Sequence, residues 1–152
     1  MGNVDDSLYD SDFYLWTQQA AERLRAGDLS ADDVARAAEE IADMGKRDRR
    51  ELPSRMIVLF MHLMKWAVQP NLRHSSTGLD TISEQRIQID GMLEHSPSLR
   101  PFLLSELPAI FASAALRAAV ETKLPFESFR AGEPDLGRLL SPAHPPESIA
   151  CL

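Results

Sequence analysis

The segment from Leu52 to Ala67 constrains the fold more than any other part of the chain, because it is apolar around most of a helix. When its residues are projected at helical spacing, the apolar side chains fall on two adjacent stripes. One stripe consists of Leu52, Met56, Leu59, Leu63 and Trp66, and the other of Ile57, Phe60, Met64 and Ala67. Together the stripes cover well over half of the circumference, so other helices must surround this one.

Other segments supply the helices that can surround it. Apolar residues recur every three or four positions in residues 12–26, 30–45, 77–95 and 96–122. No segment alternates with the period of a strand. In the second of these helices, the stripe predicted to face inward consists of Val34, Ala37, Ala38, Ile41 and Met44.

These segments predict an all-α, single-domain helical bundle of about five main helices over residues 1–152. The core is expected at about residues 9–125, with a short helix and an irregular, extended tail at 126–152. A proline inside a helix lacks the N–H that the carbonyl four residues earlier would accept, and its ring clashes with that carbonyl. We therefore expect a kink or a break near Pro53 and another near Pro108.

Charge and composition argue against several classes of function. The 152 residues carry 16 basic and 23 acidic side chains, a net charge of −7. This charge disfavours binding to nucleic acid or to an anionic membrane surface. No apolar run is expected to reach the roughly 18 residues of a membrane span, since Arg55, His62 and Lys65 interrupt the longest candidate. The N-terminus lacks the pattern of a secretory signal, and Cys151 is the only cysteine. A cytoplasmic protein without a membrane partner is expected.

Two polar residues, His62 and Lys65, stand within the apolar segment. In the helical projection both fall on the remaining strip, together with Arg55 and Gln69. Lys65 can extend its charged end to water, and His62 lies at the rim of the apolar arc, where one hydrogen bond would satisfy it. The alternative is a small polar pocket in which His62 transfers a proton or orients a ligand.

Arg86 is the more pronounced exception, because it lies in the middle of an apolar stripe. That stripe consists of Leu79, Ile82, Ile89 and Leu93. A buried guanidinium is costly without a partner, so it requires a carboxylate or a path to water. The candidate carboxylates are Glu39, Glu40 and Glu121. One interpretation is a structural ion pair that fixes the register of the helices, and the other is an anion-binding arginine on the floor of a cleft.

The familiar catalytic and metal-binding motifs do not occur in the sequence. The four histidines have no second histidine or glutamate at the spacing of a helical metal site. There is no glycine-rich phosphate loop and no Gly-x-Ser-x-Gly elbow. We therefore predict no catalytic residue, no metal and no cofactor, with a metal site assembled across helices as the open alternative. The basic cluster KRDRR at residues 46–50 is interpreted as a solvated helix face, or alternatively as a contact for an acidic partner or a phosphate.

The order of several segments resembles one known family. Between about Tyr9 and Pro125 the chain contains, in this order, DFYLWTQQAAERLRAGDL, AEEIADMGKRDRRELPSRMIVLFMHLMKW, TISEQRIQIDGMLEHSPSLRP and AAVETKLP. The most specific parts are Met-His-Leu-x-Lys-Trp and Ser-Pro-Ser-Leu-Arg-Pro. The pattern is similar to the bacterial family called domain of unknown function 29. The resemblance implies a small, cytoplasmic, all-helical protein and no established activity.

The resemblance also implies which polar positions recur in the family. Here they are Trp16, Glu39, Glu40, His62, Lys65, Trp66, Gln85, Arg86 and Glu121. Without the two tryptophans, these residues form the candidate polar cluster. The chain departs from the family pattern at Pro53, where relatives continue an unbroken helix, and in its SPAHPP ending, which replaces a more aromatic one.

Three hypotheses on function follow. The first is a non-enzymatic helical interaction or regulatory module, whose partner is an unknown protein or a second copy in a homodimer. The second is a small-molecule or anion-binding protein, or an unrecognised hydrolase, that uses Glu40, His62 and Arg86. The third is an acidic, antidote-type partner of a basic protein, which the net charge permits.

Overall fold

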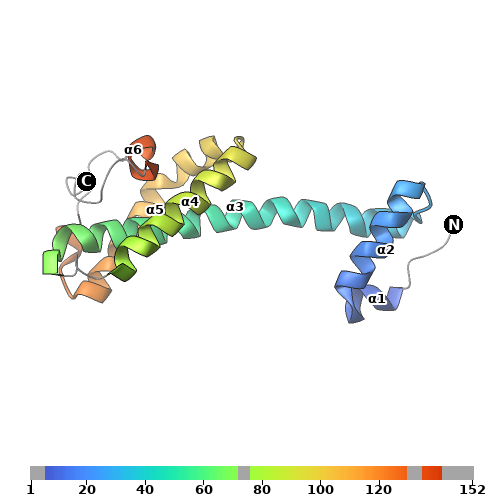
Figure 1. Ribbon diagram of the computed structural model, residues 1–152, viewed down its shortest axis with the longest axis horizontal. Helices are drawn as coiled ribbons and strands as arrows, with labels where there is room; N and C mark the ends of the chain where they lie inside the picture. Colours follow the sequence, from blue (N-terminus) through green and yellow to red (C-terminus); the bar gives the residue numbers. More distant parts are fainter. Residues whose placement is uncertain (1–5, 72–75, 130–134, 142–152) are drawn as a thin grey trace. The chain divides into compact units, whose positions relative to one another are not determined.

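All regular secondary structure in the described part of the chain is helical, as predicted. The computed structural model describes residues 6–71, 76–129 and 135–141 (Figure 1). Its elements are α1 (Asp6–Ser11), α2 (Phe13–Ala26), α3 (Ala31–Val68), α4 (Ser76–His95), α5 (Leu99–Thr122), the 3-10 turn η2 (Phe126–Ser128) and α6 (Leu136–Leu140). The predicted short helix near the C-terminus is α6, while the tail after residue 141, including Cys151, lies outside the described residues.

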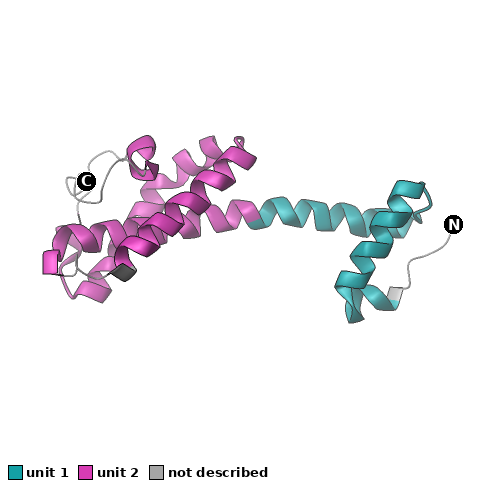
Figure 2. Cartoon of the chain, in the orientation of Figure 1, with its two compact units in different colours: residues 1–47 teal, residues 48–152 magenta. Residues whose placement is uncertain are grey.

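The chain divides into two compact units, residues 1–47 and 48–152, and the division falls inside α3 (Figure 2). Each unit has its own apolar core. The expectation of a single domain therefore stays a prediction, and the two units are described separately.

The first unit is built around Trp16. Trp16, Ala20 and Leu29 are buried, and Leu8 and Tyr9 of α1 pack against them. The Tyr9 ring meets the Trp16 ring edge to face at a centroid distance of 4.9 Å, an arrangement that aromatic quadrupoles favour. This small core joins α1 to α2.

Capping residues set the ends of the helices in this unit. The Asp12 side chain accepts a hydrogen bond from the Leu15 N–H at 3.0 Å and begins α2. Gly27 ends α2 in the left-handed conformation, with φ of 69°, which glycine adopts without a Cβ penalty. The predicted start of the next helix is confirmed, because the Ser30 hydroxyl accepts from the Asp33 N–H at 3.1 Å just before α3.

The second unit contains the predicted central helix. Leu52, Met56, Leu59 and Phe60 of α3 are fully buried, and Leu63, Met64 and Trp66 are nearly so. Three contacts join this half of α3 to its neighbours: Phe60 with Phe111 of α5, Lys65 with Glu121 of α5, and Arg55 with Gln85 of α4. α6 packs on α4, where the Arg86 Nε donates to the Leu139 carbonyl. The apolar stripes predicted from the sequence thus form the centre of this core.

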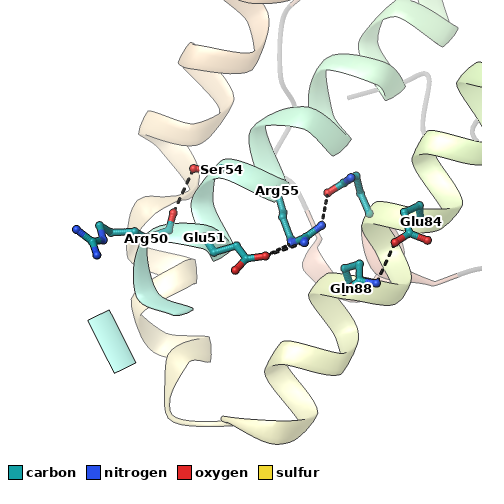
Figure 3. Close-up of polar contacts among 7 residues, drawn as sticks. Arg50, Glu51, Ser54, Arg55, Glu84 and Gln88 are labelled. Atoms are coloured by element: carbon teal, nitrogen blue, oxygen red, sulfur yellow. Dashed lines mark hydrogen bonds and ion pairs between the residues drawn. The ribbon is translucent and has the colours of Figure 1, made fainter. Parts of the chain in front are cut away.

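The breaks expected at the two prolines are wrong. Pro53 lies inside α3 and Pro108 inside α5, and both helices continue through them. A proline in a helix interior costs about 3 kcal/mol. Leu52 and Met56, on either side of Pro53, are fully buried, and burying such side chains contributes about 1.5–3 kcal/mol each. The Ser54 hydroxyl also donates to the Arg50 carbonyl at 3.2 Å (Figure 3). Burial therefore outweighs the lost hydrogen bond, and a kink at either proline stays a prediction.

The stripe expected to face inward in residues 30–45 does not do so. Val34, Ile41 and Met44 are 47, 64 and 62% exposed. They belong to the first unit, whose core forms around Trp16, Ala20 and Leu29 without them. The helical period was predicted correctly, but the burial of this stripe was not.

α5 is long and apolar enough to cross a membrane, judged by length and composition alone. The sequence expectation considered only the segment around His62 and overlooked Leu99–Thr122. Six of its residues are buried in the second unit, namely Leu103, Leu107, Ile110, Ala114, Ala115 and Ala118. Because core helices meet the same criterion, its composition does not decide between a core and a membrane helix.

Candidate functional site

The seven residues of the candidate polar cluster fall in both units. Glu39 and Glu40 lie on α3 in the first unit. The second unit holds the other five, His62, Lys65, Gln85, Arg86 and Glu121. Their contacts form four local groups, so the composite cluster itself stays a prediction.

Arg86 is buried, with 6% of its surface exposed. Its Nε donates a 2.8 Å hydrogen bond to the main-chain carbonyl of Leu139 in α6. Its Nη2 is also buried and has no hydrogen-bond partner among the described residues. Burial lowers the pKa of Arg86 from its ordinary value of 12.5. The guanidinium thus connects α6 to α4, while the two N–H groups of Nη2 have no partner among the described residues.

A hollow of about 170 Å³ lies beside Arg86. Its lining consists of Ser83, Arg86, Ile87, Asp90 and Leu140. A guanidinium and a hydroxyl can bind an oxyanion, but the Asp90 carboxylate on the same wall opposes negative charge. The hollow therefore suits a small ligand with both an acceptor and a donor group better than a simple anion.

His62, Lys65 and Glu121 form the second group. The Lys65 ammonium pairs with the Glu121 carboxylate at 2.5 Å, and both side chains are partly exposed. His62 lies half-buried near this pair. Burial lowers the pKa of His62 from its ordinary 6.5, Lys65 lowers it further, and Glu121 opposes both. The lowered pKa favours the neutral imidazole form of His62 at pH 7.

Gln85 belongs to a bridge between α3 and α4. The Arg55 Nη1 donates to the Gln85 side-chain oxygen at 3.4 Å, and its Nη2 pairs with Glu51 at 2.7 Å (Figure 3). Gln88 and Glu84 bond to each other one turn apart on α4 (Figure 3). The long Arg55–Gln85 hydrogen bond and the exposed Arg55–Glu51 and Gln88–Glu84 pairs are structural contacts, and each contributes little to the stability of the fold.

Glu40 accepts a 2.6 Å hydrogen bond from the Tyr9 hydroxyl in the first unit. The Arg36 guanidinium lies 5.6 Å from the centre of the same ring. This hydrogen bond is the main cause that raises the pKa of Tyr9 above 10.0, followed by burial and by the charges of Glu40, Glu39 and Asp10. Sequence reasoning missed this contact, because 31 residues separate Tyr9 from Glu40 and no pattern links them.

Within the described part of the chain, no group of three His, Cys, Asp or Glu side chains could hold a metal ion. His74 and His144 lie outside that part.

The second unit has an exposed apolar face on α5. One row of this face, at four-residue spacing, consists of Leu104, Pro108, Ala112, Leu116 and Val120. The adjacent row contains small residues, Pro101, Ser105, Ala109 and Ser113. Arg100 precedes the first row at the same spacing, and Arg117 follows the second row, so charged side chains border this face toward both ends of α5. The face thus has a row of larger side chains beside a row of small ones, about 30 Å long, with Arg100 and Arg117 at its borders.

Together these features define an all-helical protein. Most residues of the candidate polar cluster make separate contacts that connect one helix to another. By its sequence the chain belongs to the family described as domain of unknown function DUF29, whose model matches residues 8–136. The resemblance noted from the sequence is therefore confirmed. No curated protein and no solved structure matches the chain.

Proposed function

We propose that the protein is a non-enzymatic helical interaction module, in which the exposed face of α5 binds an apolar helix of a partner protein. One observation carries this proposal: nine exposed, uncharged residues between Pro101 and Val120 lie in two adjacent rows on α5, with Arg100 and Arg117 at the borders. Leu116 and Val120 are 60 and 73% exposed. Apolar surfaces of this extent on a soluble protein commonly mark interaction sites.

The shape of the face favours a helix as the ligand. A ridge of larger side chains beside a groove of small ones is the surface that two helices use when they pack, with the ridge of one in the groove of the other. Small residues in the groove allow close approach of the two backbones. The net charge of −7 weakens attraction to an anionic lipid surface, so a protein helix is the better ligand.

Site-specific photocrosslinking in the cells of origin tests this proposal. A photoreactive amino acid at Leu116 is expected to give one discrete product with another protein, whereas the same probe at exposed Gln88 of α4 gives none. Adding Leu104→Glu should abolish the product, because a charge in the ridge has no partner there. Identical products from both positions, products with lipid, or products only with a second copy of this chain would each refute the proposed partner.

A second candidate is binding of a small ligand at the hollow beside Arg86. It is favoured by the Nη2 donor that lacks a partner among the described residues. Acetate and glycine, which adds an ammonium donor to the carboxylate, serve as probes, followed through the NMR signal of the Arg86 side-chain N–H. Asp90→Asn is expected to strengthen anion binding, because it removes the opposing carboxylate from the wall. An unchanged Arg86 signal in both proteins would rule this candidate out.

A further inference from the structure

The hollow beside Arg86 is lined by groups of three kinds. Four residues that share one side of α4, one or two helical turns from first to last, meet a fifth from α6. They are Ser83, Arg86, Ile87, Asp90 and Leu140. They supply hydrogen-bond donors, a carboxylate and apolar surface along about two turns of α4. A ligand that fits this hollow has to satisfy all three.

The buried end of Arg86 is not bonded to the carboxylate in the same hollow. Arg86 and Asp90 are four residues apart, which is close enough on a helix for the two to pair. The Arg86 Nε instead donates to the Leu139 carbonyl at 2.8 Å, and its buried Nη2 has no hydrogen-bond partner among the described residues. A buried donor without an acceptor costs free energy, which an acceptor on a ligand recovers. The hollow therefore offers a ligand a donor at Arg86 and, one turn further along α4, an acceptor at Asp90.

The apolar part of the lining is small. Ile87 is 66% exposed, which is a large fraction for an apolar side chain, whereas Leu140 is 7% exposed. The hollow measures about 170 Å³, and a cavity of about 150 Å³ accommodates a molecule of the size of benzene. There is thus room for a short aliphatic group beside the polar groups, but not for a nucleotide or a large aromatic side chain.

We propose that the hollow binds a free aliphatic α-amino acid of about the size of valine. The carboxylate of the ligand accepts from the Arg86 guanidinium and the Ser83 hydroxyl, and its ammonium donates to the Asp90 carboxylate. The side chain of the ligand covers Ile87 and packs against Leu140. An α-amino acid carries both charged groups on one carbon, so it can bridge Arg86 and Asp90, which lie about 6 Å apart along α4. This inference rests on the second candidate function above and names its ligand.

Other classes of small ligand satisfy only part of the lining. A simple anion meets the donors but is repelled by Asp90, and a simple amine meets Asp90 but leaves the buried Nη2 of Arg86 without an acceptor. A neutral apolar molecule covers Ile87 and leaves both charged groups without a partner in the ligand. A zwitterion with an aliphatic group supplies what each part of the lining needs.

Titration of the full chain with matched probes tests the ligand class, followed through the NMR signal of the Arg86 side-chain N–H. Valine is expected to bind with a dissociation constant of roughly one millimolar, because the hollow is small. Isovalerate lacks only the ammonium of valine, isobutylamine lacks only its carboxylate, and glycine lacks its side chain. Isovalerate should bind about threefold more weakly than valine, and isobutylamine and glycine about tenfold more weakly. Isovalerate or isobutylamine that binds as tightly as valine would overturn the proposal.

A single variant separates a zwitterion from an anion. Asp90→Asn removes the partner of the ammonium and also the charge that repels an anion. It should therefore weaken valine binding about threefold and strengthen isovalerate binding. Asp80→Asn is the matched control, because Asp80 is also exposed on α4 but does not line the hollow. A change of both affinities in the same direction would contradict the proposal.

The apolar wall has a test of its own. Ile87→Ala should reduce the preference for valine over glycine, whereas Ile41→Ala, which changes a similarly exposed isoleucine in the first unit, should leave it unchanged. If valine binds no more tightly than glycine in the wild type, this inference fails while the second candidate function stands. If no probe shifts the Arg86 signal, both fail. The α5 face is tested separately by crosslinking at Leu116, which none of these probes affects.

Discussion

The two halves of α3 carry the same kind of apolar stripe, yet only one is buried. In the C-terminal half, Leu52, Met56 and Leu59 are enclosed within the second unit. In the N-terminal half, Val34 and Ile41 repeat at equivalent spacing but are exposed. The difference lies in what surrounds each half. The C-terminal half has two long helices, α4 and α5, to pack against, whereas the short α1 and α2 form a core around Trp16. A periodic stripe therefore shows that a helix has an apolar face, but it does not show which segment, if any, packs against that face.

The largest expected effect comes from truncating matched positions in the two halves. Leu59→Ala removes a fully buried side chain and should destabilise the protein by about 2–5 kcal/mol. Ile41→Ala should change stability by less than about 0.5 kcal/mol, because this side chain is 64% exposed. Urea unfolding followed by circular dichroism measures both. Equal losses would mean that the N-terminal half is covered within one chain and would remove the contrast.

Replacing Pro53 tests whether burial of side chains stabilises the C-terminal half of α3 despite the free-energy cost of a proline inside the helix. Pro53→Ala restores an N–H to the helix and removes the clash with the Arg49 carbonyl. After allowance for the greater freedom of the unfolded chain, we expect a gain of about 2 kcal/mol in unfolding free energy. Pro97→Ala, just before α5, serves as the control and should give no such gain. A loss of stability on Pro53→Ala would show that the helix depends on the proline.

The C-terminal half should also respond to pH through His62. Its folded pKa lies below the ordinary 6.5, so the unfolded chain takes up a proton at a higher pH than the folded one. Stability contributed by neutral His62 is therefore complete above pH 6.5 and is lost as pH falls through the folded pKa. Lys65→Met removes one cause of the lowering and should raise the pKa of His62. Glu121→Gln should lower it further.

An NMR titration of the His62 ring in these two variants measures the shifts. Opposite shifts are expected, because Lys65 and Glu121 carry opposite charges. Shifts in the same direction would mean that the variants act by changing the burial of His62 rather than its electrostatic surroundings.

The smallest effect concerns the N-terminal half, where Tyr9 bonds to Glu40. Glu40→Gln should lower the pKa of Tyr9 toward 10, because the anionic acceptor and its charge are the main causes of the raised value. Absorbance of the phenolate in a Tyr14→Phe background measures this titration, since the chain has only two tyrosines. An unchanged Tyr9 pKa would show that the hydrogen bond between Tyr9 of α1 and Glu40 of α3 does not form in solution.

Periodicity and capping predicted the helices and the centre of the core, because both act over three or four residues. Continuity through Pro53 could not be predicted in this way, since it depends on side chains buried against distant segments. The site residues show the same limit. Lys65 and Glu121 were both candidates, but their pairing depends on the packing of α3 against α5. The partner of Arg86 is a main-chain carbonyl, which has no signature in the sequence.

The Arg86–Leu139 contact also has an evolutionary consequence. A hydrogen bond to the main chain places a requirement on only one of the two positions, because every amino acid carries a carbonyl. Substitution of Leu139 by another apolar residue would preserve the acceptor, whereas substitution of Arg86 would remove the donor. Position 139 therefore needs only an apolar side chain of suitable size, whereas position 86 needs the guanidinium that attaches α6.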